Sequence, residues 1–290
     1  MRDWLMRQAL RAARRRAGLN QRLQTLPWGR LVYHSAGEGR EGTPLLLLHG
    51  ACADHSSWLA WLAALRWRGP VLVPDLPGHG ESTVPPDADL GISAQTERML
   101  DWLDSLAVRH VHLIAHSMGG AIAIRLAALR PALVRSLTLI SSAGAETQPS
   151  ELRRHVERGH PHPMVEVDSL PDYRAMLAWG MAKPPYLPGF VQRWLLAQKQ
   201  PRRTTERKLL RDLARDQDQR ALLGQVKAPT LLLWGELDRV VHVADAATLA
   251  SGIANSRITV LPQQGHVPMV EAAAEVAQRC REFLFEVEAS

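Results

Sequence analysis

The chain has 290 residues, of which 46% are apolar and 22% are charged. This composition is typical of a globular protein and excludes collagen-like, low-complexity and disordered chains. The length allows either two domains or one α/β core with an insertion. The two cysteines, Cys52 and Cys280, lie far apart in the sequence and match no metal-binding spacing, so we expect free thiols and no bound metal.

Positive charge is concentrated at the N-terminus. Residues 1–26 contain seven arginines and one acidic residue, and the whole chain carries a formal net charge of +6. A nucleic-acid-binding protein would instead show a basic face interleaved with aromatic side chains, so we expect no nucleic-acid partner. We interpret residues 1–26 as a basic N-terminal arm.

The arm has the pattern of an amphipathic helix. Trp4, Leu5, Ala9 and Leu10 fall on one helical face, with arginines around the rest. Such a helix is either solvated or lies on an anionic membrane surface. No apolar run is long enough to span a bilayer or to form the hydrophobic part of a signal peptide. We therefore expect a cytoplasmic location, with or without peripheral contact between the arm and a membrane.

Short aliphatic runs alternate with helical patterns from residue 30 onward. The runs predict strands at 31–34, 45–48, 71–74, 111–115, 137–140, 230–234 and 258–261. Amphipathic patterns between them predict helices at about 93–106, 119–130 and 271–285, the first of them capped by Ser93. Runs that are apolar on both faces and separated by helices indicate parallel strands covered on both sides. The expected fold class is α/β, with a mostly parallel sheet.

The alternation stops after Ala143 and resumes at Pro229. The residues between them contain no convincing strand, but they do contain several prolines and charged amphipathic stretches. An insertion of this kind between two strands is typical of a helical cap. We therefore expect three parts, namely the basic arm at 1–26, a core formed by 27–144 and 227–290, and a helical cap at 145–226.

A serine follows the strand expected at 111–115. The next segment reads HSMGG and leads into a helix, which is the pattern of a nucleophile elbow around Ser117. Ala115 stands where this pattern usually has a glycine, and a small side chain is all that the position requires. Because a Ser-x-Gly sequence after a strand also occurs in turns without chemistry, the motif alone does not decide the function.

A serine hydroxyl needs a base to accept its proton, and the base needs an acid to orient it. Asp238 follows the strand expected at 230–234, and His266 follows the strand expected at 258–261. Each alone has an ordinary explanation, because Asp is a common turn former and His is a common loop residue. Ser117, Asp238 and His266 together, in this order and after successive strands, predict a catalytic triad.

Ester chemistry also requires two backbone N–H groups that stabilise an oxyanion. We expect one from Met118, directly after the nucleophile, and the other from Ala51, with Cys52 as the second choice. His49 is expected to brace its own loop. His116 is expected beneath the elbow, because His266 fits the role of the base better.

With these residues and the segment DLPGHGES in place, the chain resembles an α/β-hydrolase over about residues 30–286. The segments HGACADHSSW, PALVRSLTLISSAG and LLLWGELDRVVHV, together with the cap, are similar to bacterial lipases and esterases of the monoacylglycerol-lipase-like group. The resemblance implies a cofactor-free serine hydrolase of lipid and carboxylic esters, often membrane-associated through its N-terminus. Two residues depart from the family pattern: Ala51 replaces a bulkier residue, and His116 replaces a frequent Asn.

Two other functions share this pattern. A cofactor-free perhydrolase or acyltransferase would use the same triad and differ only in the nucleophile that attacks the acyl-enzyme. A non-catalytic receptor with a hydrolase fold is the other alternative, although an intact triad argues against it. Nothing in the sequence predicts an oligomeric state.

Overall fold

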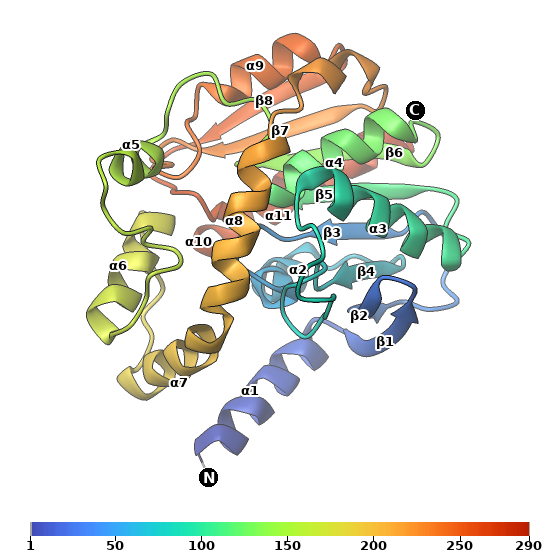
Figure 1. Ribbon diagram of the computed structural model, residues 1–290. Coiled ribbons are helices and arrows are strands. Elements are labelled where there is room, and N and C mark those ends of the chain that lie inside the picture. Colours follow the sequence, from blue (N-terminus) through green and yellow to red (C-terminus); the bar gives the residue numbers. More distant parts are fainter. Residues whose placement is uncertain (1, 290) are drawn as a thin grey trace.

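The computed structural model describes residues 2–289, except for the side chains of Arg2, Asp3, Leu5 and Arg7. Its centre is an eight-stranded sheet in the order β1-β2-β4-β3-β5-β6-β7-β8 (Figure 1). The strands are β1 (Asn20–Leu26), β2 (Gly29–Ala36), β3 (Leu45–Leu48), β4 (Val71–Pro74), β5 (Val111–His116), β6 (Val134–Ile140), β7 (Thr230–Gly235) and β8 (Ser256–Leu261). Strand β2 pairs antiparallel with β1 and β4, and the other pairs are parallel. The expected mostly parallel α/β fold is therefore confirmed.

Two hydrophobic cores lie on opposite faces of the sheet. Along β3, Leu46 and Leu48 belong to one core, and Leu45 and Leu47 belong to the other. Because successive side chains of a strand point to opposite faces, a strand buried on both sides must be apolar throughout. The unbroken aliphatic runs of the sequence arise from this double burial.

Helices cover both faces. The helices around the first core are α3 (Ile92–Ser105), α4 (Met118–Leu129) and α9 (Asp245–Gly252). Those around the second are α2 (Leu59–Leu65), α10 (Pro268–Glu271) and α11 (Ala273–Glu288), with the short 3-10 helix η1 (His55–Trp58) before α2. Trp58 and Trp61 are fully buried in this second core, so these tryptophans serve packing.

The N-terminal segment differs from the expected arm. Residues Asn20–Leu26 form β1 at the edge of the sheet, so the core begins inside the range expected for the arm. Helix α1 (Arg2–Arg16) precedes it, and Ala13 and Ala17 pack against the second core. The helix is therefore docked on the core and not freely solvated. Among the described residues, no helix is long and apolar enough to cross a membrane.

The segment expected as a cap is helical. Its elements are α5 (Glu151–Glu157), α6 (Leu170–Gly180), α7 (Gly189–Lys199), η2 (Gln200–Arg202), α8 (Arg203–Asp216) and η3 (Arg220–Gln225). Helices α5, α6 and α7 gather at one end of the sheet, apart from α3, α4 and α9 (Figure 1). Helix α8 returns the chain to the core, where Leu209 and Leu213 pack with the residues around α3. Its last residue, Asp216, accepts hydrogen bonds from the N–H groups of Ile92 and Ser93 and thereby caps α3.

Candidate active site

Ser117 occupies a sharp turn between β5 and α4. Its backbone has φ 53° and ψ −121°, a region that non-glycine residues rarely adopt, and such strain is a mark of functional sites. Gly50 lies directly against this turn, because a Cβ at Gly50 would come within 3.0 Å of the Ser117 Cβ and 2.8 Å of the His116 Nδ1. The strand–turn–helix context that the motif requires is present, and the turn holds the hydroxyl above the carboxyl end of the sheet.

The structure brings the three residues expected as a triad together. His266 Nε2 lies 3.0 Å from Ser117 Oγ, and His266 Nδ1 lies 2.9 Å from Asp238 Oδ2. The Asp238 side chain is fully buried, and its second oxygen accepts hydrogen bonds of 2.9 Å from the N–H groups of Val240 and Val241. With both oxygens engaged, the carboxylate is fixed in position, so the Nδ1–H tautomer of His266 directs its unprotonated Nε2 at the serine.

The loop that carries His266 is fixed by contacts that the sequence analysis missed. Glu271, at the end of α10, accepts hydrogen bonds of 2.8 to 3.3 Å from four backbone N–H groups, those of Gly265, Val267, Ala182 and Lys183. The His266 N–H donates to the Gly180 carbonyl at the end of α6. Glu271 therefore joins the histidine loop to the cap. Because its partners are backbone groups, no sequence motif marks it.

His116 contacts the loop that carries His266. Its Nε2–H donates to the His266 carbonyl oxygen over 2.8 Å, and the two rings lie 4.7 Å apart. Burial, followed by the proximity of His266, holds the pKa of His116 well below its usual value. His116 is thus a neutral ring that supports the backbone of His266.

The two backbone N–H groups expected to stabilise an oxyanion lie in segments close to Ser117. Met118 is the first residue of α4, so its N–H has no partner within the helix, and the helix dipole adds partial positive charge there. Ala51 follows Gly50, which contacts Ser117. Within residues 2–289, neither N–H donates to another protein group. Cys52, the second choice for this N–H donor, has a left-handed backbone with φ 58°. Burial raises the pKa of its thiol to about 12, so the thiol is a poor nucleophile near neutral pH.

Comparison with known proteins decides the family. The profile of the Alpha/beta hydrolase family matches residues 45–279. The chain belongs to this family. Lipase 1 of Psychrobacter immobilis is 30% identical to the hydrolase over 93% of this chain and 86% of its own length. The monoacylglycerol lipase ABHD6 of Bos taurus is 28% identical over 86% of this chain and 78% of its own length.

Solved structures agree with this assignment. A crystal structure of a membrane phospholipase A, described as a bacterial virulence factor, superimposes on the hydrolase with a TM-score of 0.95. It is 32% identical in sequence, with 100% of this chain and 93% of that chain covered. The expected family and the enzyme class, a carboxylic ester hydrolase of the lipase and esterase type, are confirmed.

His49 holds its own loop in place through two hydrogen bonds, as expected. The Nδ1–H of His49 donates to the Gly50 carbonyl over 2.8 Å, and its Nε2 accepts the N–H of Leu76 over 2.9 Å. The ring is fully buried and burial lowers its pKa, so the neutral form is held in place. This contact fixes the loop that carries Ala51 to the turn after β4.

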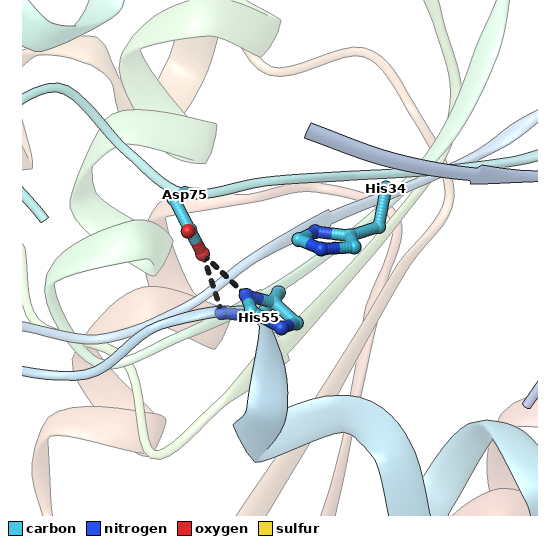
Figure 2. A group of neighbouring side chains, drawn as sticks. All are labelled: His34, His55 and Asp75. Carbon is cyan, nitrogen blue, oxygen red and sulfur yellow. Dashed lines mark hydrogen bonds and ion pairs between the residues drawn. The ribbon is translucent and has the colours of Figure 1, made fainter. Parts of the chain in front are cut away.

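A second group of polar side chains lies near the site. His34, His55 and Asp75 are buried together, with one potential ligand atom of each within 4.8 Å of the others. Figure 2 shows the Asp75 carboxylate bonded to both the backbone N–H and the Nδ1 of His55, while His34 lies over the His55 ring. The two rings are stacked, with centroids 3.7 Å apart and planes 24° apart.

This group does not fit a metal ion. A metal binds imidazole in the plane of the ring, and two stacked, nearly parallel rings share no such point at bonding distance. The ring atoms of His55 are also engaged, because Nδ1–H donates to Asp75 and Nε2 accepts the Nε–H of Arg14 over 2.9 Å. Burial alone would raise the pKa of Asp75, but the hydrogen bonds from His55 and from the Glu81 N–H hold it below its usual range.

A cavity of about 480 Å³ lies between α1, α6, α7 and the loop that begins at Cys52. Of the described residues that line it, none belongs to the triad. Cys52, which lines the cavity, comes two residues after Gly50, and Gly50 lies against the elbow. The cavity volume falls within the usual range for small-ligand sites.

Proposed function

We propose that the protein is a serine hydrolase of single-chain lipid esters, such as monoacylglycerols, and that Ser117, His266 and Asp238 are its catalytic triad. The observation that carries this proposal is the pair of contacts made by His266, at 3.0 Å to Ser117 Oγ and 2.9 Å to Asp238 Oδ2. Both distances lie within hydrogen-bond range for a nucleophile, its base and the orienting acid.

The reaction follows from this arrangement. His266 Nε2 takes the Ser117 proton as Oγ attacks the ester carbon, and the carbonyl oxygen becomes an oxyanion that accepts the N–H groups of Met118 and Ala51. When the tetrahedral intermediate collapses, the imidazolium gives its proton to the leaving alcohol, and an acyl-enzyme remains. Water, deprotonated by His266, then attacks the acyl carbon, releases the fatty acid and restores Ser117. No cofactor takes part in this sequence.

Three features support a lipid substrate. Two of the relatives named above are lipases, and the superimposed structure is a phospholipase. In the cap, Tyr186, just before α7, is 90% exposed, and Phe190, within α7, is 49% exposed. Pro184, Pro185 and Pro188 limit the conformations of the segment before α7, which favours a narrow, defined entrance and therefore single-chain esters.

The N-terminal helix is proposed to contact an anionic membrane. Trp4, Arg15 and Arg16 are exposed on α1, and α1 and α7 contact each other at the same end of the molecule (Figure 1). Exposed aromatic residues, Trp4 and Phe190, therefore occur on two helices that contact each other. Basic residues near an anionic surface contribute about 1 kcal/mol each at modest ionic strength.

The membrane contact is tested by co-sedimentation with vesicles of phosphatidylglycerol and phosphatidylcholine. The double variant Trp4→Ala/Arg16→Gln is expected to bind about tenfold more weakly than the natural protein at low salt, and raised salt is expected to reduce the difference. Equal sedimentation of both proteins at low salt contradicts membrane contact by α1 and leaves the hydrolase assignment untouched.

The catalytic assignment is tested with a fluorophosphonate probe and a soluble nitrophenyl ester. The probe is expected to label Ser117 in the natural protein and nothing in Ser117→Ala, and Ser117→Ala and His266→Ala are expected to lower turnover by several orders of magnitude. Asp238→Asn is expected to lower turnover without unfolding the protein, because it stabilises the wrong tautomer. Labelling that persists in Ser117→Ala contradicts the assignment.

The same protein samples decide between hydrolysis and acyl transfer. With an alcohol or hydrogen peroxide added, the ratio of transfer product to free acid reports which nucleophile the acyl-enzyme accepts. A hydrolase gives mainly free acid at low alcohol concentration. Absence of any turnover over a chain-length series of esters would instead favour a non-catalytic receptor.

A further inference from the structure

The cavity between α1, α6 and α7 has two chemically different walls. The cap and α1 supply an apolar wall, formed by Leu10, Tyr173, Met176, Trp194 and Leu195. The opposite side is polar and comes from the core, where Ser56, His55, Asp75 and Glu81 line the cavity. A cavity with this division suits an amphiphilic ligand. A polar group against the apolar wall, or an apolar group against the polar wall, would be unfavourable.

The charges that line the cavity are balanced. Lys199 pairs with Glu206 at 2.8 Å, and both side chains are almost fully buried. Arg14 pairs with Glu81 at 3.3 Å, and a third pair joins Arg202 and Asp54 at 3.9 Å. Three of the four cations in the lining therefore already have a carboxylate partner, and the fourth, Arg11, is exposed. The cavity consequently offers little net attraction to an anionic group.

Arg14 determines the position of the α1 wall. Its Nε donates to His55 Nε2 over 2.9 Å, and its two terminal nitrogens donate to Gln21 over 3.0 Å and to Glu81 over 3.3 Å. His55 is in turn anchored to the buried Asp75 over 2.7 Å. One side chain of α1 is thus bound to three separate points of the core, so Arg14 holds the helix against the cavity.

We propose that this cavity binds the uncharged, hydroxyl-bearing head of the substrate ester, and that Arg14 is the positioning residue that sets selectivity for it. This inference rests on the proposed function. The apolar wall contacts the beginning of the acyl chain, and the polar wall offers hydrogen bonds to the hydroxyls of the head. A wholly apolar occupant would cover the exposed polar side chains of Ser56 and Glu81 without replacing their contacts with water, which is unfavourable.

The test uses ligands that cannot be hydrolysed. Inhibition of nitrophenyl ester hydrolysis is compared for 1-O-octylglycerol, 1-octanol and octyl phosphate, all below their aggregation concentrations. The glycerol ether is expected to inhibit about tenfold more strongly than octanol, as two additional hydrogen bonds would give, and more strongly than octyl phosphate. Equal inhibition by the ether and the alcohol, or strongest inhibition by the phosphate, overturns the proposal.

Variants show which residues produce the preference for the glycerol ether. Arg14→Gln is expected to reduce the preference for the glycerol ether over octanol to about twofold or less, whereas Arg15→Gln, an exposed neighbour on the same helix, keeps it. If Arg14→Gln fails to fold, Gln198→Leu, on the α7 side of the cavity, is expected to reduce the preference in the same way. An unchanged preference in the folded variants overturns the proposal.

The two proposals fail differently. If Ser117→Ala still hydrolyses the ester, the proposed function is wrong, whatever the inhibitors do. If hydrolysis depends on Ser117 but the three inhibitors rank otherwise than expected, only the head-group site is wrong. Binding of 1-O-octylglycerol to Ser117→Ala, measured by calorimetry, gives the same preference without any turnover.

Discussion

Removal of the Glu271 carboxylate is expected to weaken both the fold and the catalysis. In Glu271→Ala, the N–H groups of Gly265, Val267, Ala182 and Lys183 lose their common acceptor. Each hydrogen bond to a charged group contributes about 1.5 to 3 kcal/mol when buried, but this side chain is half-exposed and water can replace part of the contact. We therefore expect the free energy of unfolding to fall by about 3 kcal/mol.

The catalytic effect follows from the position of the loop. Two of the four donors flank His266, so its imidazole would lose the support that keeps Nε2 at 3.0 Å from Ser117 Oγ. A displacement of about 1 Å lowers rates by up to about 100-fold. We expect kcat for a soluble short-chain ester to fall about 10- to 100-fold, while KM changes less, because the loop positions the proposed base and proton transfer takes place in the transition state.

The assay combines denaturant unfolding with steady-state kinetics and the rate of fluorophosphonate labelling. Glu275→Ala is the matched control, because Glu275 is an exposed acid in the next helix. We expect it to change the free energy of unfolding by no more than about 1 kcal/mol, through the helix dipole, and to leave kcat unchanged. If Glu271→Ala behaves as this control does, Glu271 does not position the histidine loop.

Two further predictions concern stability. A Cβ at Gly119 would lie 2.6 Å from the carbonyl oxygens of Leu48 and His49, so Gly119→Ala is expected to destabilise the fold by about 3 kcal/mol. A Cβ at Gly189 would meet only the Arg193 side chain, at an ordinary contact distance of 3.7 Å, so Gly189→Ala is expected to be nearly neutral in thermal unfolding. Burial lowers the pKa of His34 from 6.5 to about 3, so the unfolded chain binds the proton more tightly and stability is lost as the pH falls below about 6.5. The free energy of unfolding is measured from pH 7 to 4.5 for His34→Phe and for the natural protein. The slope of the variant should be smaller by up to about 1.4 kcal/mol per pH unit, and identical slopes contradict this account.

The sheet was predictable from the sequence wherever burial acted on both faces. The aliphatic runs at β3, β5 and β7 are buried at every position, and each was located within one residue of its observed bounds. Strand β1 was missed for the opposite reason. It lies at the edge of the sheet and is mostly exposed, so its sequence NQRLQTL carries neither an apolar run nor a strict alternation.

The site was predictable where residue type and chain order carry the chemistry. Ser117, Asp238 and His266 each follow a strand, and the parallel arrangement brings strand ends together. Contacts made through the backbone or over long distances in the sequence gave no such signal. Ser93 was expected to cap α3, for example, but Gly91 holds the N-cap position and the carboxylate of Asp216, more than 120 residues later, accepts the first free N–H groups.

The separation of Ser117 and His266 also has a consequence for the synthesis of the chain. The two residues are 149 positions apart, with the whole cap between them. At about 5 to 20 residues per second, the ribosome adds the histidine on the order of ten seconds after the serine. Throughout that interval the serine lacks the proposed base and the loop that Glu271 later holds in place. With the proposed triad, a nascent chain therefore carries an unreactive hydroxyl, and ester cleavage would begin only after β8 has joined the sheet.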